Sequence, residues 1–354
     1  MNYMENEPER EIKVKPSSMQ LAALLEKSLH ARLADPALKQ TQAYRIFNGF
    51  YEGFSGMVVD RFDQTIVISN HHKQPDSIKP AVETTIEYFR KHVNSLLVKT
   101  RHSPDPQARK GIIVHGSTLC EQIEENGVRY SLDLQLNQDN SFYLDTRDLR
   151  TWLKENSQER SVLNCFAYTG SLGIAALAGS AKAVLQTDLN AAALALAEAS
   201  YKLNNFSHKM NLLIRDFFSV VNHLKQQKIL FDIVILDSPF FSSTRYGKVD
   251  LQNSFHDLVN KVRPLVGHGG KLILINNALF FSGSQLMQEI EDFQSSGYLS
   301  LQSIVPIPSD ITGYAMTRQD DPPCDPAPFN HPTKVTVLDV TRKDKCIANF
   351  PLLP

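Results

Sequence analysis

The chain has 354 residues, 42% of them hydrophobic and 21% charged, a composition typical of globular proteins. Its length predicts two domains, because one domain averages roughly 100 to 200 residues. No apolar run approaches the ~20 residues of a membrane span, and the charged start lacks a signal core, so we expect a cytoplasmic protein without a membrane partner. The formal net charge of −1 argues against a protein that holds nucleic acid by a large basic excess.

The four cysteines and the small groups of cations carry no strong functional signal. The cysteines show neither a C-x-x-C pair nor a zinc spacing, which favours reduced thiols and predicts no metal site. Cations at 101–110 and 245–248 could belong to a basic stripe, although solvated surface is the simpler interpretation.

The N-terminal part predicts a helical arm over 1–43 and a small α+β domain over 44–135 that could bind substrate. An amphipathic helix is expected at 18–34, with Ser18 as its N-cap and Asp35-Pro36 as its stop. The Asn-Gly pair at 126–127 indicates a hairpin with a type I′ turn. Further elements are expected at 56–60, 65–69, 95–100 and 111–115 as strands, and at 79–92 as a helix.

Residues 136–354 predict an α/β domain of alternating strands and helices, with a continuous apolar run at 230–237 as a central buried strand. The segment 310–332 is rich in proline and aspartate, and a loop of this length either closes over a site or connects without fixed structure. The other strands are expected at 162–166, 183–186, 210–215, 269–276, 298–307 and 334–340, and helices at 172–178, 191–203, 251–266 and 284–296.

The segment 161–190 is the most informative part of the chain, because it reads as strand, glycine turn, helix, strand and acid. Gly170 and Gly173 would let a ligand approach the backbone at the carboxyl end of the first strand, and Asp188 could accept hydrogen bonds from ribose hydroxyls. A dinucleotide is the obvious alternative, but Tyr168 and Thr169 stand where its first glycine would be. A βαβ unit whose glycines serve only close packing is the other alternative.

Acids follow three of the expected strands, at Asp188, Asp216 and Asp237. The carboxyl ends of parallel strands meet at one edge of a sheet, so these acids would gather there. Carboxylates suit a guest with hydroxyls, an exocyclic amine and a cationic centre better than they suit a phosphate.

The run VLNCFAYTG at 162–170 resembles the first motif of class I S-adenosylmethionine-dependent methyltransferases, within the large-subunit ribosomal RNA methyltransferase group. FYLDTRDLR at 142–150 and YEGFSGMVVDRF at 51–62 are similar to two further segments of that group. The resemblance covers about 44–343, without a recognisable RNA-binding PUA module. It implies a Rossmann-like domain with a seven-stranded mixed sheet and helices on both faces, behind the small α+β domain.

The resemblance also implies cofactor-binding residues. Asp188, followed by Leu189 and Asn190, would bind the ribose, and Asp216 with Phe217 would hold the adenine. Asp145 and Arg147 would lie near the amino-acid end of the cofactor. The methionine half would face the turn formed by Asn164, Phe166, Ala167, Tyr168, Thr169 and Gly170.

Asp237, Pro239 and Phe240 would face the transferring methyl group, with Asp237 accepting a hydrogen bond from an exocyclic amine and Phe240 stacking on a base. Ser238 replaces the first proline of the group's motif. Asn276-Asn277 stands where branches that methylate cytosine C5 place a nucleophilic cysteine, so direct transfer to a guanine nitrogen of ribosomal RNA is favoured. A small-molecule or protein acceptor, a non-catalytic assembly role and a homodimer all remain open.

Overall fold

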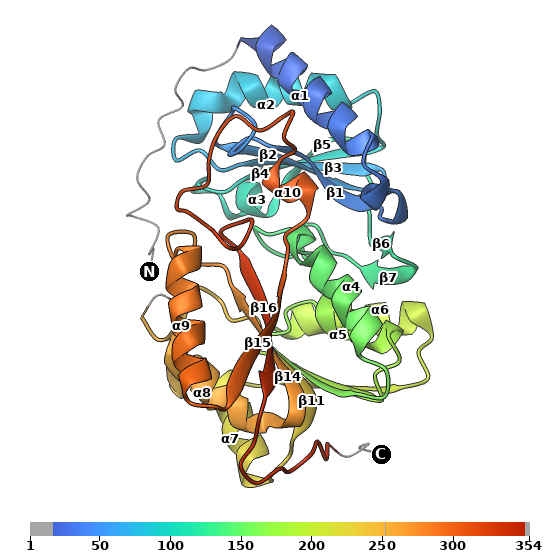
Figure 1. Ribbon diagram of the computed structural model, residues 1–354. Helices are drawn as coiled ribbons and strands as arrows, with labels where there is room; N and C mark the ends of the chain where they lie inside the picture. Colours follow the sequence, from blue (N-terminus) through green and yellow to red (C-terminus); the bar gives the residue numbers. More distant parts are fainter. Residues whose placement is uncertain (1–16, 252, 351–354) are drawn as a thin grey trace. The chain divides into compact units, whose positions relative to one another are not determined.

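The computed structural model describes residues 17–251 and 253–350, and the chain forms two compact units (Figure 1). Unit 1 runs through Cys120 and also contains Ser309–Asp321, whereas unit 2 contains Glu121–Pro308 and the chain from Pro322 onward. The sequence predicts a domain boundary at 135/136 and a separate arm before residue 44. Both predicted boundaries differ from those of the two units. In the described chain, no helix is both long and apolar enough to cross a bilayer.

Unit 1 is a five-stranded sheet in the order β1-β2-β3-β4-β5. Helices α1 and α2 pack against each other and onto the sheet, burying Leu21, Leu25 and Phe89 with the strand side chains. Helix α1 is therefore part of this unit rather than an arm, and Ser17 instead of Ser18 is its N-cap, in a capping box with Gln20. The elements are α1 (Ser18–Leu33), β1 (Ala43–Asn48), β2 (Met57–Phe62), β3 (Thr65–Asn70), α2 (Lys79–Phe89), β4 (Ser95–Thr100), α3 (Pro106–Lys110), β5 (Ile112–His115) and α10 (Ser309–Thr312).

The segment Ser309–Asp321 is fixed in unit 1 by buried polar contacts. Arg32 forms a two-pronged ion pair with Glu52, at 2.5 and 3.0 Å, and also donates to the carbonyl of Asp310 at 2.8 Å. The Asp310 carboxylate accepts from the backbone N–H of Arg45 at 2.9 Å. The segment 310–332, expected as one loop, is therefore divided, with its first part built into the sheet domain and its remainder in unit 2.

Unit 2 contains the seven-stranded sheet that the resemblance implied, in the order β10-β9-β8-β11-β14-β16-β15. Strand β16 runs antiparallel between β14 and β15, whereas β10, β9, β8, β11 and β14 are parallel. Continuous apolar sequence makes its central strands, because both faces are covered. The strands are β8 (Ser161–Cys165), β9 (Ala183–Asp188), β10 (Lys209–Ile214), β11 (Phe231–Leu236), β14 (Val266–Asn276), β15 (Leu299–Val305) and β16 (Lys334–Val340).

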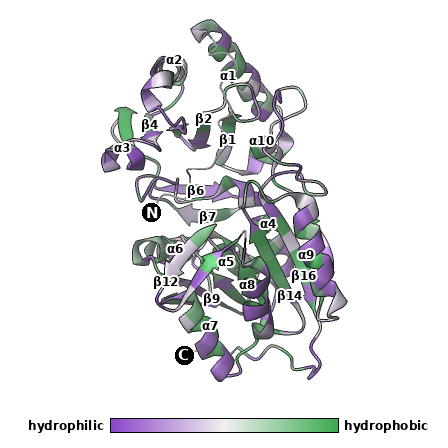
Figure 2. Cartoon of the chain, turned by 90° about the vertical axis from the view of Figure 1, so that its left-hand side faces the viewer, coloured by the Kyte–Doolittle hydropathy of each residue, from purple (hydrophilic) through white to green (hydrophobic). Residues whose placement is uncertain are grey.

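Helices cover both faces of this sheet, with α4 to α6 on one side and α7 to α9 on the other (Figure 1). Helix α9 buries Leu286, Ile290 and Phe293 in the core and turns polar residues outward, so purple and green both occur along it in Figure 2. The helices are α4 (Arg147–Asn156), α5 (Ser171–Ala178), α6 (Ala191–Asn204), α7 (Phe217–Gln226), α8 (Phe255–Val262) and α9 (Gly283–Ser295).

Two hairpins complete unit 2. The hairpin β6 (Gln122–Glu125) and β7 (Val128–Ser131) is joined by the expected Asn-Gly turn, and its Ser131 N–H donates to the Ser200 hydroxyl of α6 at 2.8 Å. This contact places the hairpin in unit 2, ahead of the expected boundary. The hairpin β12 (Phe241–Thr244) and β13 (Gly247–Asp250) was not expected, because its polar residues show no apolar alternation.

Candidate active site

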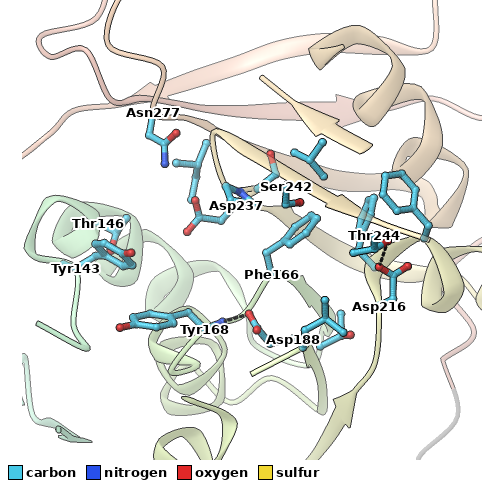
Figure 3. Close-up of a pocket in the computed structure, with 18 of the residues that line it drawn as sticks. Tyr143, Thr146, Phe166, Tyr168, Asp188, Asp216, Asp237, Ser242, Thr244 and Asn277 are labelled. Atoms are coloured by element: carbon cyan, nitrogen blue, oxygen red, sulfur yellow. Dashed lines mark hydrogen bonds between the residues drawn. The ribbon is translucent and has the colours of Figure 1, made fainter. Parts of the chain in front are cut away.

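A cavity of 330 Å³ lies at the carboxyl ends of the parallel strands of unit 2. Its volume is at the lower end of the ~300 to 1,000 Å³ typical of small-molecule sites. Acids that end or follow three strands, Asp188, Asp216 and Asp237, line it together with Asp145 from the segment before α4. Asp188, Asp216 and Asp237 come from separate parts of the chain and border the same space in Figure 3. The lining also includes the predicted residues Phe166, Tyr168, Leu189, Phe217 and Pro239.

The turn after β8 is built from left-handed residues, two of which are not glycine. Phe166 has φ +56°, Tyr168 φ +51° and Gly170 φ +76°. Holding a non-glycine residue in this region costs of order 1 to 2 kcal/mol, so the surrounding structure must stabilise the turn. The Tyr168 N–H donates to Asp188 at 2.8 Å, and this contact is marked in Figure 3. The conformation of the turn directs the Phe166 side chain into the cavity, between Asp237 and Asp188 (Figure 3).

The Asp188 carboxylate is held by backbone donors on both oxygens. One oxygen accepts from Tyr168 and the other from the Asn190 N–H, also at 2.8 Å. Two fixed donors orient the carboxylate at the cavity wall and leave its remaining lone pairs for a ligand. The arrangement can accept hydrogen bonds from a pair of hydroxyl groups.

Asp216 caps helix α7 and contacts the β12–β13 hairpin. One carboxylate oxygen accepts from the Ser219 N–H at 3.1 Å, and the other accepts from the Thr244 hydroxyl at 2.8 Å (Figure 3). Beside it, the Phe217 ring stacks on Phe166, with centroids 4.6 Å apart at 28°. The acid and the two rings form a partly aromatic compartment suited to a flat, hydrogen-bonding ring.

Asp237 lies at the other end of the cavity, near a second acid. Burial and the neighbouring Asp145 raise the pKa of Asp237 to about 7. Asp145 accepts a hydrogen bond from the Thr333 hydroxyl at 3.3 Å. A buried carboxylate with a second carboxylate beside it creates a place where a cationic group is stabilised. This end of the cavity therefore suits a cation.

The Asp237-Ser238-Pro239-Phe240 segment is divided between cavity and surface. Ser238 is buried, and no residue in the described parts of the chain bonds its hydroxyl. Pro239 lines the cavity, but Phe240 does not, and its side chain is 42% exposed. Phe240 is therefore available to a group outside the cavity rather than to one within it.

Six other predicted residues are absent from the lining of the cavity. The Arg147 guanidinium pairs with buried Glu125 at 3.4 Å, a contact that fixes α4. Asn164 donates to Gln186 within the sheet at 3.0 Å. Thr169 donates to the Ser141 carbonyl, and Asn190 caps α6. The remaining two, Ala167 and Gly170, belong to the turn itself.

Several lining residues were missed at the sequence level. Ser242, Thr244 and Val249 come from the unexpected hairpin, which only the Gly247 turn could have indicated. Tyr143 packs against Tyr168 with ring centroids 5.4 Å apart, and Arg215 precedes the acid of α7. The other missed side chains are Thr146, Thr187, Phe218, Ile275 and Thr333, whereas Ser238 and Asn277, which also line the cavity, lie in motifs that were identified from the sequence.

The cysteines lie outside the lining of this cavity. Cys165 is fully buried in β8, and burial raises the pKa of its thiol to about 12. Cys324 donates to the Leu279 carbonyl at 3.0 Å, and burial raises the pKa of its thiol as well. Both thiols are therefore weak nucleophiles near neutral pH.

Comparison with known proteins agrees with this geometry. Ribosomal RNA large subunit methyltransferase I of Aeromonas salmonicida (strain A449) is 30% identical over 264 residues, which cover 72% of this chain and 65% of that relative. The protein of the same name from Aliivibrio fischeri (strain MJ11) is 28% identical over 297 residues, covering 77% of this chain and 74% of the relative. The chain thus spans about two thirds of the length of the first of these relatives.

A solved structure of SMU.776, a candidate methyltransferase complexed with SAH, superposes with a TM-score of 0.80 at 23% identity. The superposition covers 93% of this chain and 83% of that one, so the two share the fold. The model of the S-adenosylmethionine-dependent methyltransferase family matches residues 80–299, more than half of the chain. The chain therefore belongs to the S-adenosylmethionine-dependent methyltransferase family, and S-adenosylmethionine is its cofactor.

Proposed function

We propose that the chain methylates a base of large-subunit ribosomal RNA, by direct transfer to a guanine nitrogen. Methyl transfer from S-adenosylmethionine follows from the family. The RNA acceptor is supported by the names of the two curated relatives, each a ribosomal RNA large subunit methyltransferase. Transfer to nitrogen is supported by the composition of the cavity.

The cavity fits the cofactor at three points. The fixed Asp188 carboxylate would accept from the ribose hydroxyls, and Asp216 would accept from the adenine amine, with Phe217 beside the ring. Asp145 and Asp237 would face the positively charged methionine end, because their two negative charges lie close together at this end of the cavity. When bound, the cofactor supplies an electrophilic methyl group on a sulfonium.

The acceptor would approach from the Asp237 side of the cavity. A guanine amine or ring nitrogen that donates a hydrogen bond to Asp237 would have its lone pair directed at the methyl group. The proton released from nitrogen can pass to Asp237, whose pKa of about 7 suits a group that both accepts and releases it near neutral pH.

The observation that carries the choice of nitrogen is the chemistry of the cavity wall. Methylation at cytosine C5 requires a thiolate that attacks C6. The wall instead presents Asp237, Ser238 and Asn277, and Cys165 is buried in a strand with its thiol protonated. Direct transfer needs an acceptor that is already nucleophilic, which a guanine nitrogen provides.

Incubation of the protein with methyl-labelled S-adenosylmethionine and ribosomal RNA from a strain lacking the gene tests the acceptor. We expect label in large-subunit RNA and in a single nucleotide after mapping. Matched reactions contain ribosomal protein or a small-molecule extract in place of RNA. Label in either of those, with none in RNA, would replace RNA by a protein or small-molecule acceptor. The absence of transfer in every reaction would favour a binding or assembly role.

A further inference from the structure

The β12–β13 hairpin follows directly after the Asp237-Ser238-Pro239-Phe240 segment and has two different sides. Its Ser242, Thr244 and Val249 side chains line the cavity. Its turn carries Arg245 and Tyr246, and the Tyr246 side chain is 51% exposed. One short element therefore contributes both to the cofactor cavity and to the surface beside it.

Hydrogen bonds connect the cavity side to the turn. Thr244 donates to Asp216 at 2.8 Å, and the same Thr244 oxygen accepts from the Tyr246 N–H at 3.2 Å. Thr244 therefore connects the backbone of the turn to Asp216, the acid beside Phe217 in the cavity.

The outer side of the hairpin combines aromatic rings with cations. The Arg245 guanidinium lies 4.6 Å from the Tyr246 ring centroid and donates to the Tyr246 hydroxyl at 2.5 Å. The Lys248 ammonium lies 4.9 Å from the Phe241 ring, and the Lys248 side chain is 56% exposed. The Phe241 ring is half-buried, whereas the Tyr246 ring is exposed. An exposed ring next to cations is the composition with which proteins bind single-stranded nucleic acid, by base stacking and phosphate contacts.

Other exposed apolar side chains surround the same edge of the sheet, where the strands end. Phe240 follows β11, and Ile214 is the last residue of β10. Exposed apolar side chains at the end of the sheet that also carries the cavity are available to contact a bound molecule. The remaining members of this group are Tyr143, Leu189, Leu279 and Phe280.

We propose that the β12–β13 hairpin binds single-stranded RNA next to the target base, with Tyr246 stacking on a neighbouring base and Arg245 contacting its phosphate. The inference rests on the proposed RNA acceptor and names the surface that holds it. The chain has a net charge of −1, so its grip on RNA must come from local cations of this kind rather than from overall charge. An exposed strand of RNA can present its bases to such a surface, whereas a duplex keeps them stacked inside.

Tyr246→Ala and Arg245→Ala test the hairpin, and Arg129→Ala is the matched control. Arg129 is another exposed arginine, paired with Glu124 at 3.6 Å on the β6–β7 hairpin. Binding is measured with a single-stranded ribosomal RNA fragment that contains the mapped nucleotide, and cofactor affinity is measured by calorimetry on the same samples.

We expect Tyr246→Ala to weaken RNA binding and raise the KM for RNA roughly 5- to 150-fold, the range for loss of one stacked base. Cofactor affinity should stay within about twofold, and Tyr246→Phe should restore RNA binding because it keeps the ring. Arg245→Ala should also reduce the slope of log Kd against log salt by about 0.7, the value for one phosphate contact on a single strand. Arg129→Ala should change none of these quantities.

The RNA acceptor and the RNA-binding role of the hairpin are refuted by different results. If the wild-type protein labels RNA but the Tyr246 and Arg245 variants keep its RNA affinity and KM, the hairpin is not the RNA surface. If the wild-type protein labels no RNA at all, the proposed acceptor is wrong. If Tyr246→Phe weakens RNA binding as much as Tyr246→Ala does, the result would also contradict a stacking role.

Discussion

Asp188→Asn removes one charge and one acceptor oxygen from the carboxylate at the end of β9, and changes no volume. In the structure both oxygens are used, one by the Tyr168 N–H and one by the Asn190 N–H, each at 2.8 Å. The amide oxygen of asparagine can accept from only one of these two N–H groups. The NH₂ group, which only donates, would then face the other N–H. A ribose hydroxyl bonded to the charged form would lose the corresponding interaction.

The expected loss of cofactor affinity follows from the strength of hydrogen bonds to a charged group. Such bonds contribute about 1.5 to 3 kcal/mol each, so loss of one weakens affinity roughly 10- to 150-fold. Loss of the Tyr168 contact adds to this, because Tyr168 is left-handed at φ +51° and depends on Asp188 for its N–H partner. Calorimetry with S-adenosylmethionine and with SAH measures the change directly.

Asp232→Asn is the matched control for Asp188→Asn. Asp232 also accepts a backbone N–H at 2.8 Å, from Ser161, but it lies at the opposite, amino-terminal edge of the parallel strands. Both variants should lower the free energy of unfolding, whereas only Asp188→Asn should weaken cofactor binding. Equal cofactor affinity for Asp188→Asn and the wild type would remove Asp188 from the site.

Three further variants test other parts of the structure. Asp237 should make cofactor binding depend on pH: its pKa is raised to about 7, so the anion that stabilises a sulfonium forms as pH rises. S-adenosylmethionine affinity should therefore increase between about pH 6 and 8, by less than tenfold per unit, whereas the affinity for SAH, whose sulfur carries no charge, should increase less. Asp237→Asn should remove this pH dependence for both ligands, and an equal pH dependence of the two ligands in the wild type would contradict the charge pairing. Gly173→Ala would place a Cβ 2.4 Å from Gln186 Oε1, so denaturant titration should show a loss of about 1 to 3 kcal/mol, and unchanged stability would mean that this packing adjusts freely. Glu52→Ala leaves Arg32 buried without its carboxylate and should lower the free energy of unfolding by about 3 to 5 kcal/mol. Glu87→Ala, at the exposed ion pair with Arg90, should lower it by about 0 to 1 kcal/mol. Similar losses for the two variants would refute the dependence on burial.

The sheet of unit 2 could be predicted because its strands are long and apolar and each is followed by a distinct polar residue. The strand at 230–237 corresponds to β11, and the acids after three strands do line one cavity. Periodicity and strand-end chemistry are local signals, so one sequence suffices to find them. The family resemblance implied a mixed sheet, but neither it nor any local pattern predicted that β16 is the antiparallel strand.

The parts that could not be predicted depend on contacts between distant residues. The β12–β13 hairpin is short and polar, and its position is fixed by Thr244 and Asp216 rather than by apolar alternation. Arg147 reads as a candidate for the cofactor's carboxylate, but Glu125, on the β6–β7 hairpin, pairs with it. The anchoring of Asp310 by Arg32 joins residues 278 positions apart, which no local pattern reveals. Side-chain partners of this kind follow from the three-dimensional structure alone.

The identity of the methylated nucleoside tests the central claim most directly. After a single turnover with methyl-labelled S-adenosylmethionine, the labelled ribosomal RNA is digested to nucleosides and separated by chromatography with mass detection. We expect the label in a guanosine carrying the methyl group on nitrogen, because the cavity wall supplies Asp237 and Asn277 rather than a reactive thiolate. Label in 5-methylcytidine, together with its loss in Cys165→Ser or Cys324→Ser, would contradict direct transfer to nitrogen.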